Sequence, residues 1–411
     1  MDIRMRKDAD AITAASIQAV QPDRAVIRAL EGKEFPGRVL LVAAGKAAWA
    51  MAKAAHDCMG ERIEAGVVVT KYGHIMGPIA NYDCREAGHP VPDGNSFAGT
   101  QAALDLVRGL KAEDTVLFLL SGGGSALFEK PLIPGEVLRD VTRQLLACGA
   151  DIVEVNTIRK RLSAVKGGRF AQACAPAQVF SIVLSDILGD PLDMIGSGPA
   201  CPDSATSAQA LAVAKKYKLN LTPDTWSLLE QETPKSLDNV TTLVTGSVRE
   251  LCTAAADKCE ALGYEPVFLT DRLCCEAREA GSFLASILKS HAGSGKSLAF
   301  IAGGETVVHL TGAGKGGRNQ ELALAAADGI AGLAGAAVFS VGSDGTDGPT
   351  DAAGGYVDGT TLAELKAKGL DPFAVLSAND AYHALKAVDG LIVTGPTGTN
   401  VNDVAVALLR G

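Results

Sequence analysis

The 411-residue sequence is poor in aromatic residues, at 5%, and has no long apolar run. Because a transmembrane helix needs about 20 consecutive apolar residues, we expect no membrane span. The charged start, Met1-Asp-Ile-Arg-Met-Arg-Lys-Asp8, lacks the apolar stretch of a signal peptide. Nine scattered cysteines show no Cys-x-x-Cys spacing. This pattern predicts reduced thiols in a cytoplasmic protein and neither a disulfide framework nor a structural zinc site.

Positive charge is also scarce, because 38 Lys and Arg residues face 47 Asp and Glu residues and leave a net charge of −9. This balance argues against nucleic acid as the main partner. An acidic protein that binds small anions must gather its cations locally. Glycine, by contrast, is abundant at 46 residues. Many glycines in an apolar sequence predict an α/β fold with tight strand-to-helix turns, and the length predicts two or three domains.

One stretch organises the sequence: the apolar run Val116–Leu120 ends abruptly in a glycine-rich turn. In an α/β protein, ligands bind beyond the carboxyl ends of parallel strands. Backbone amides and serine hydroxyls of such a turn suit a phosphate or a carboxylate. The candidate residues are Ser121, Gly122, Gly123, Gly124 and Ser125. A flexible turn between two buried elements is the alternative.

Cations stand near two other predicted turns. The strand candidate Val39–Ala44 runs into Gly45-Lys46 and an Ala-rich helix, which places Lys46 at a helix N-terminus suited to anions. A basic segment follows at residues 155–169 and offers further candidates, namely Asn156, Arg159, Lys160 and Lys166. A solvated basic helix face is the alternative for this segment. We interpret His89, beside a proline, as a loop residue with a satisfied imidazole, and contact with substrate is the alternative.

Carboxylates follow two further strand candidates. Asp186 stands at the end of Val179–Leu184, where an acid can reach a metal or a substrate hydroxyl. A second loop crowds three acids together after residues 338–341, namely Asp344, Asp347 and Asp351. A divalent cation that carries nucleotide phosphates would explain them, and so would simple capping of turns.

The polar stretch 232–239 is a candidate linker, and it divides the chain into residues 1–235 and 240–411. In the second half, Gly312, Gly314 and Gly317 match the Gly-x-Gly-x-x-Gly spacing of dinucleotide folds, a weak signal in a glycine-rich chain. Arg318 would open the next helix and suits an anion there. After a turn at residues 395–400, we expect a final helix.

Taken together, these motifs resemble the class II glycerate kinases, which are glycerate 2-kinases with an N-terminal glycerate kinase domain and a C-terminal MOFRL domain. Many members are labelled hydroxypyruvate reductase in tartrate-utilisation clusters. The motifs span nearly the whole chain in the family's order: Ala44-Gly-Lys-Ala47, Leu120-Ser-Gly-Gly-Gly-Ser-Ala126, Asn156-Thr-Ile-Arg-Lys-Arg-Leu-Ser163, Lys166-Gly-Gly168, Leu184-Ser-Asp186, Gly196-Ser-Gly-Pro199, Gly303-Gly-Glu-Thr306, Gly317-Arg-Asn-Gln-Glu321, Gly342-Ser-Asp-Gly-Thr-Asp-Gly348 and Gly395-Pro-Thr-Gly-Thr-Asn-Val401.

The resemblance implies a Rossmann-like N-terminal α/β domain (1–235), a C-terminal α/β domain (240–411, MOFRL region about 296–405) and a cleft between them. It implies phosphorylation of the 2-hydroxyl of D-glycerate by ATP with Mg²⁺, giving 2-phosphoglycerate. The family's catalytic lysine and arginine map onto Lys46 and Arg318. We add Asp186 as a third catalytic candidate and as a metal ligand beside the three loop aspartates. Gly198, Glu305 and Asn319 complete the predicted binding residues.

Two other functions stay open at this stage. A hydroxypyruvate reductase that uses NAD(P)H is motivated by the Gly-x-Gly-x-x-Gly spacing and by the family's labels. A non-catalytic sensor of sugar acids is the third class. In each case the partner is a small molecule, with no nucleic acid and no membrane. The sequence leaves the oligomeric state open, and a homo-oligomer is compatible with it.

Overall fold

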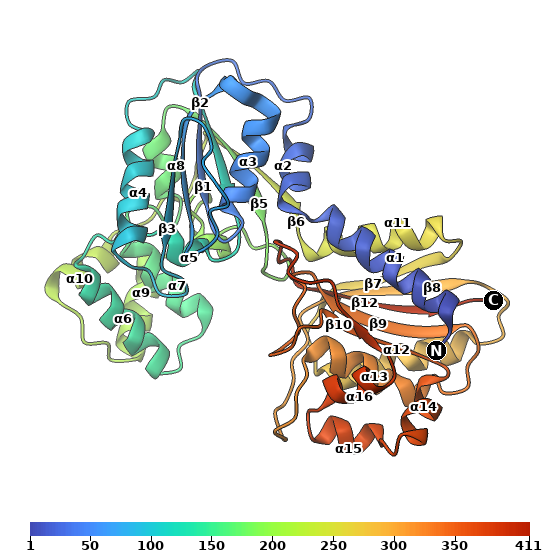
Figure 1. Cartoon of the computed structure of the whole chain (residues 1–411). Coiled ribbons are helices and arrows are strands. Elements are labelled where there is room, and N and C mark those ends of the chain that lie inside the picture. The colour runs from blue at the N-terminus through green and yellow to red at the C-terminus, as the bar shows by residue number, and fades with distance from the viewer. The chain divides into compact units, whose positions relative to one another are not determined.

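The computed structural model describes all 411 residues and divides into two compact units, shown in Figure 1. The first unit is residues 22–245, and the second unit is residues 1–21 with 246–411. The predicted domains differ from these units because helix α1 (Ile3–Ala19) packs against α11 (Val248–Ala261). Burial of one face of α1 holds it in the second unit. Helix α1 ends before Pro22, where the chain passes into the first unit.

The first unit is built on a six-stranded sheet with the order β3-β2-β1-β4-β5-β6. The pairs among β1 to β5 are all parallel. Parallel strands that are covered on both faces form continuous apolar runs, as β1 and β4 do here, with every residue buried. The strands are β1 (Val39–Ala44), β2 (Ile63–Lys71), β3 (Tyr82–Ala87), β4 (Thr115–Leu120), β5 (Gln178–Leu184) and β6 (Val240–Gly246).

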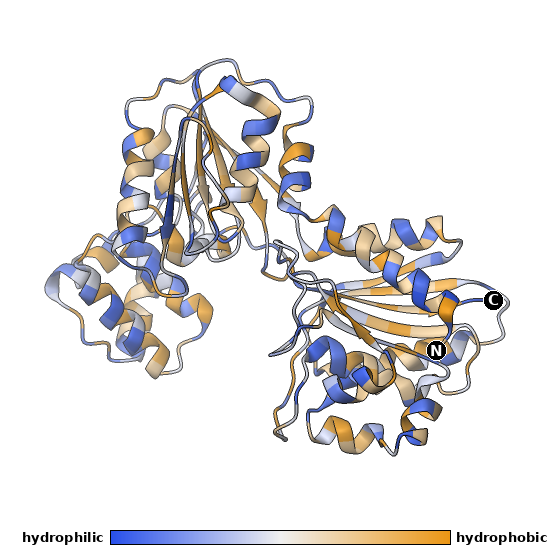
Figure 2. Cartoon of the chain, viewed as in Figure 1, coloured by the Kyte–Doolittle hydropathy of each residue, from blue (hydrophilic) through white to orange (hydrophobic).

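Helices cover both faces of this sheet. The strands are the most hydrophobic part of the unit (Figure 2). Leu41 packs on the face of α2 and α3, and Val42 packs on the opposite face with α4 and α8. A separate small helical layer, formed by α6, α7, α9 and α10, has its own core. The helices are α2 (Pro22–Leu30), α3 (Ala48–Met59), α4 (Gly94–Leu106), α5 (Gly124–Leu127), α6 (Gly135–Ala147), α7 (Ile152–Arg161), α8 (Arg169–Cys174), α9 (Ser207–Lys216) and α10 (Pro223–Glu230), with short 3₁₀ turns η1 (Gly60–Arg62) and η2 (Ile195–Ser197).

The second unit has a mixed six-stranded sheet with the order β11-β10-β9-β12-β8-β7. Strand β12 lies between β8 and β9 and is antiparallel to both. The strands are β7 (Glu265–Leu273), β8 (Leu298–Gly304), β9 (Ala336–Gly342), β10 (Gly354–Asp358), β11 (Leu391–Ile392) and β12 (Asp403–Leu409). The remaining helices are α12 (Ala277–His291), α13 (Arg318–Gly329), α14 (Thr361–Ala367), α15 (Pro372–Ser377) and α16 (Ala381–Ala387).

The prediction of a final helix was wrong, because that segment forms β12. All seven residues of β12 are buried, so the strand lacks the alternation that would identify it, and a short apolar run alone does not distinguish strand from helix. The two-domain α/β architecture that the sequence predicted is confirmed. None of the helices has the length and apolar character needed to cross a bilayer.

Candidate active site

The point where the first sheet changes direction brings two predicted loops together. Strand β1 has β2 on one side and β4 on the other, so the chain leaves β1 and β4 in different directions. Such a switch point opens a crevice at the carboxyl ends of the strands. The amide of Lys46 donates to the Gly122 carbonyl at 2.9 Å, and the amide of Ala47 donates to Ser121 Oγ at 3.1 Å. Lys46 and the loop of residues 121–125, called the glycine loop below, therefore form one site.

Gly123 sits at the centre of this site with a φ of +85°, a left-handed conformation that favours glycine. A Cβ atom on Gly123 would lie 3.2 Å from Lys46 Cγ and 3.0 Å from His89 Cδ2. His89 therefore borders the site, and the alternative interpretation, a contact with substrate, stays a prediction. Burial, together with the charges of Lys46 and Lys71, lowers the pKa of His89 below its usual value. The ring is therefore neutral at pH 7.

Asp186 approaches the same loop from the end of β5. A Cβ atom on Gly122 would lie 2.3 Å from Asp186 Oδ2, so the glycine lets this carboxylate approach the loop closely. A cation, a neutral imidazole and a carboxylate thus surround one turn of partly buried backbone. This set can bind an anion, orient a hydroxyl and accept its proton.

Two lysines of the basic segment form buried ion pairs. The Lys160 ammonium lies 3.0 Å from Asp203 and 3.3 Å from Asp193, and its side chain is only 2% exposed. Lys166 lies 3.0 Å from the Glu129 carboxylate, and both side chains are fully buried. Burial lowers the pKa of Lys166 to about 8, against the attraction of Glu129. These two lysines are engaged inside the protein, so the solvated helix face is wrong for them and a direct ligand contact stays an untested prediction.

The same segment braces the far end of the glycine loop. Lys166 Nζ donates to the Ser125 carbonyl at 2.7 Å, and Arg159 Nη2 donates to it at 3.3 Å. The Ser125 and Ser197 hydroxyls are 2.9 Å apart, and Ser197 Oγ donates to Asn156 Oδ1 at 3.1 Å. Asn156 is buried. The carbonyl of Gly198, another predicted binding residue, accepts from the Gly168 amide. In the structure, Asn156, Arg159, Lys166 and Gly198 therefore support the glycine loop or the turns beside it.

The second unit carries its own polar site where β8 and β9 end and β12 begins. Asp403 pairs with Gly304 and Gly342 in the sheet register. Arg318, the first residue of α13, reaches it through two contacts: Nε lies 2.5 Å from Oδ2, and Nη2 lies 3.1 Å from Oδ1. Arg318 Nη1 also donates to Glu305 Oε1 at 3.0 Å. Burial tends to lower the pKa of Arg318, but the hydrogen bonds and charges of Asp403 and Glu305 raise it overall.

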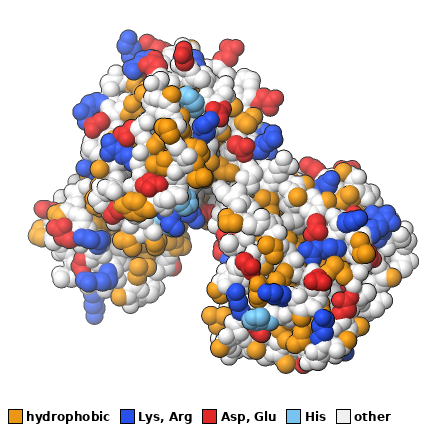
Figure 3. Space-filling view, viewed as in Figure 1, with side chains coloured by type: hydrophobic (Ala, Val, Ile, Leu, Met, Phe, Trp, Pro, Cys, Tyr) orange, Lys and Arg blue, Asp and Glu red, His pale blue; other side chains and the backbone are white.

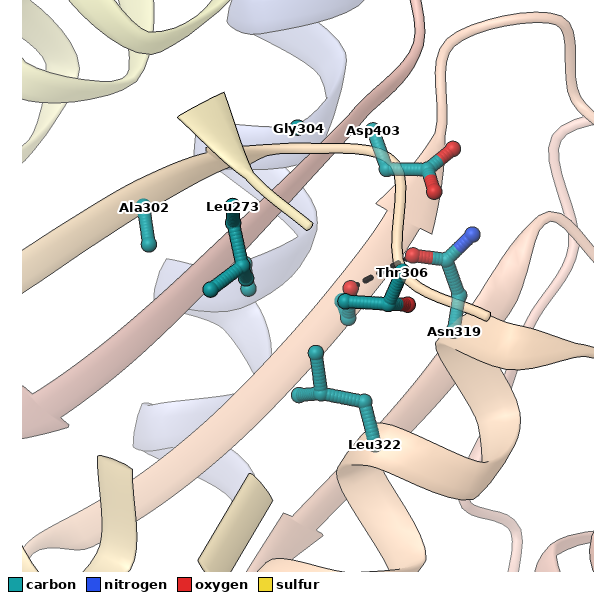
Figure 4. Close-up of a pocket in the computed structure, with 9 residues that line it drawn as sticks. Leu273, Ala302, Gly304, Thr306, Asn319, Leu322 and Asp403 are labelled. Atoms are coloured by element: carbon teal, nitrogen blue, oxygen red, sulfur yellow. Dashed lines mark hydrogen bonds between the residues drawn. The ribbon is translucent and has the colours of Figure 1, made fainter. Parts of the chain in front are cut away.

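A small pocket lies beside this ion pair and is lined in part by Asp403, Thr306 and Asn319 (Figure 4). Asn319 was predicted to bind ligand, but its side chain is turned inward. It accepts from Ser340 Oγ at 2.5 Å and donates to Asp347 at 3.3 Å. With 1% of Asn319 exposed, this residue anchors the first turn of α13. The Arg318 side chain as a whole is 33% exposed, so an anion in solvent can approach it.

The three loop aspartates do not converge as a metal site. Asp347 accepts from the backbone amides of Asn319 and Gln320 at 3.1 and 2.9 Å, so it caps α13. Burial raises the pKa of Asp347 to about 6. Asp351 accepts from Tyr382 Oη at 2.7 Å, and Asp344 accepts from the amide two residues further on. No group of three or more His, Cys, Asp or Glu side chains is placed to hold a metal. Capping, the alternative interpretation, describes Asp344 and Asp347.

The Gly-x-Gly-x-x-Gly spacing also lacks the context that a dinucleotide fold requires. That motif directly follows a strand and opens a helix, but residues 305–317 separate β8 from α13. A Cβ atom on Gly312 would lie 2.2 Å from the Ala378 carbonyl oxygen. One on Gly314 would lie 2.5 Å from Asp380 Cβ. These glycines therefore allow close packing against the turn before α16.

Comparisons with known proteins place this geometry in a family. Residues 8–230 match the domain of unknown function DUF4147, and residues 298–403 match the MOFRL family. The chain is 53% identical to the D-glycerate 2-kinase of Thermotoga maritima, over 98% of both sequences. A crystal structure of glycerate kinase from the same organism superimposes with a TM-score of 0.95 at 52% identity, covering 99% of each chain. The chain belongs to the class II glycerate 2-kinase family.

The family also contains proteins with another name. A relative from Agrobacterium vitis, 39% identical over 99% of this chain and 95% of its own, is provisionally named a hydroxypyruvate reductase. The family assignment rests on the two family models and on these relatives, and it confirms the resemblance inferred from the motifs. Two residues at these sites were not among the predicted site residues. His89 had only a neighbouring proline as a signal, and Asp403 stands at the start of the apolar run that we expected to be a helix.

Proposed function

We propose that the protein phosphorylates D-glycerate at its 2-hydroxyl, using ATP and releasing 2-phosphoglycerate and ADP. The observation that carries the proposal is the junction of Lys46 with the glycine loop at the switch point of the first sheet. Phosphoryl transfer needs mostly positioning and cations that neutralise the migrating group. This site supplies an ammonium, backbone amides and a carboxylate, as the family membership leads us to expect.

Each side chain of the first unit's site then has a role. Lys46 would neutralise charge on the transferred phosphoryl group, and the glycine loop would hold phosphate oxygens. Asp186 would orient the attacking hydroxyl and take its proton. His89, neutral because burial and Lys46 lower its pKa, would accept or donate one hydrogen bond without adding charge.

Arg318 would contribute the second cation. Its contacts with Asp403 and Glu305 fix the guanidinium, and fixed donors stabilise developing charge without reorganising. In this proposal the arginine contacts either the substrate carboxylate or the phosphoryl oxygens. Both are anions that suit its planar fork of donors.

Mg²⁺ belongs to the proposal as a partner of the nucleotide. The loop aspartates do not fit it as a group. However, Mg²⁺ is usually held by one or two carboxylates together with substrate phosphates and waters. Asp186, beside the glycine loop, is our candidate for such a carboxylate, and the ion would neutralise charge between donor phosphates. We also propose a cytoplasmic location, because none of the nine cysteines is paired.

Two assays on one preparation test the proposal. In the first, the protein is incubated with D-glycerate and Mg-ATP, and ADP is measured together with the phosphorylated product, whose position is read by ³¹P and ¹³C NMR. In the second, it is incubated with hydroxypyruvate and NADH, and absorbance is followed. We expect ADP and 2-phosphoglycerate in the first and no NADH oxidation in the second. NADH oxidation without ADP formation would favour the reductase.

A further inference from the structure

An apolar groove of about 860 Å³ lies in the first unit between α6, α7 and the loop at residues 90–92. Large hydrophobic side chains stand exposed along it: Leu146 is 67% exposed, Ile152 65% and Val91 59%. Figure 3 shows hydrophobic side chains gathered over this small helical layer. Exposed apolar surface of this kind marks a place that another molecule covers, and the volume lies within the range of small-molecule sites.

Two of the residues that line the groove border the glycine loop. Arg159 lines the groove and donates to the Ser125 carbonyl at 3.3 Å. Pro90 also lines it and follows His89, whose ring lies against Gly123. A ligand bound along the groove can therefore reach the loop with one end.

Charge points to an anion at that end, because Arg159 lines the groove there and contacts the loop. The lining also includes Arg139 and Arg143, of which Arg143 pairs with Asp140, and it contains no Asp or Glu. The ligand therefore combines a sizeable, largely apolar part with a negatively charged part. D-Glycerate has three carbons and only polar substituents, so it is too small and too polar to fill this groove. A nucleoside triphosphate has both parts, because its base is flat and apolar on its faces and its phosphates are anionic.

We propose that this groove binds the adenine and ribose of ATP, and that the phosphates extend from it to the glycine loop. The assignment rests on the proposed kinase function and deepens it, because it separates the nucleotide's site from that of D-glycerate. Ile152 and Leu146 form the apolar wall against the base. Arg159 lies where the nucleoside meets the phosphates.

Two neighbouring positions provide a matched test. Ile152 and Val153 both lie in the first turn of α7, and Val153 is 58% exposed but does not line the groove. An acidic residue is well tolerated in a first helical turn, so both Ile152→Asp and Val153→Asp should fold. Leu146→Asp, on α6, is a second groove variant. The probes are ADP, which carries the nucleoside, and inorganic tripolyphosphate, which does not, each titrated by calorimetry.

We expect Ile152→Asp and Leu146→Asp to weaken ADP binding by about tenfold or more, because each removes apolar contact from the base. Val153→Asp should leave ADP binding unchanged, and tripolyphosphate should bind all three variants and the wild type equally. In turnover assays, the KM for ATP should rise in the groove variants while the KM for D-glycerate stays constant.

Several results would overturn the assignment. Equal ADP affinity in all variants would do so, as would a parallel loss of ADP and tripolyphosphate affinity, which indicates a charge effect on the phosphates alone. A changed sedimentation coefficient in the groove variants with unaltered ADP affinity would show that a second copy covers the groove. If the wild type binds ADP through the groove but does not phosphorylate D-glycerate, the proposed substrate fails and the groove assignment stands.

Discussion

Replacing Lys166 with methionine should destabilise the first unit by about 3–5 kcal/mol, the usual cost of breaking a buried ion pair. The Lys166 ammonium and the Glu129 carboxylate are 3.0 Å apart and fully buried. Neither Glu129 oxygen has a partner in hydrogen-bonding geometry, so the carboxylate depends on charge attraction. Without Lys166, only Arg159 remains near it, at 3.8 Å. The loss is a large part of the roughly 5–15 kcal/mol that stabilises a typical domain.

Tryptophan fluorescence during urea unfolding measures this change selectively. The chain has 2 tryptophans, Trp49 in α3 and Trp226 in α10, and both belong to the first unit. The double variant Lys166→Met, Glu129→Gln should recover most of the loss, because it removes both charges together. Lys53→Met, which breaks the exposed pair with Asp57, is the control and should cost less than about 1 kcal/mol.

The pH dependence provides a second signature. Because burial lowers the pKa of Lys166 from 10.5 to about 8, the unfolded chain binds more protons than the folded one between these values. The contribution of this group to stability therefore rises with pH across that window, and Lys166→Met should abolish the rise. If Lys166→Met unfolds like the wild type but weakens the binding of ATP or D-glycerate, Lys166 is a ligand-binding residue and our structural account of it is wrong.

Four further outcomes follow from the two sites. Lys46→Ala should reduce kcat by orders of magnitude with an unchanged urea midpoint, and near-normal turnover would rule out its proposed role. Arg318→Lys cannot reproduce both contacts with Asp403 and should lower kcat/KM by about tenfold or more, which steady-state kinetics will measure. Because the pKa of His89 is lowered from 6.5, we expect the pH profile of kcat/KM to show no step near pH 6.5 that depends on His89. A step at that pH that disappears in His89→Gln would contradict a neutral ring. Burial raises the pKa of Asp347 from 3.8 to about 6, so the contribution of Asp347 to stability falls as pH rises between these values. Asp347→Asn should remove this pH dependence of the unfolding free energy, measured by circular dichroism in urea. An unchanged pH dependence would refute the raised pKa of Asp347.

Much of the first site could be predicted because each of its loops follows an apolar strand. Lys46, the glycine loop and Asp186 come after β1, β4 and β5, and parallel strands bring their carboxyl ends to one edge. The partners of buried charges could not be predicted in this way. Lys166 is a lysine in a basic run, and nothing local shows that Glu129, 37 positions earlier, lies beneath it.

The second site was predicted less well for a related reason. Asp347 and its neighbours look like metal ligands in a glycine-rich loop, but the orphan amides of α13 satisfy Asp347. Asp403, the partner of Arg318, is 85 positions away in sequence. It faces Arg318 only because β12 inserts between β8 and β9, and pairing of distant strands has no local signature.

The central position of β12 determines when its sheet can be completed during synthesis. A ribosome makes residues 403–409 after every other strand of that sheet, so β8 and β9 have no shared neighbour until the end of the chain emerges. Helix α1, the first element made, packs against α11 and must wait through the synthesis of the entire intervening unit. Residues 22–245, the first unit, can therefore fold before the second unit, whose two sequence segments precede and follow them.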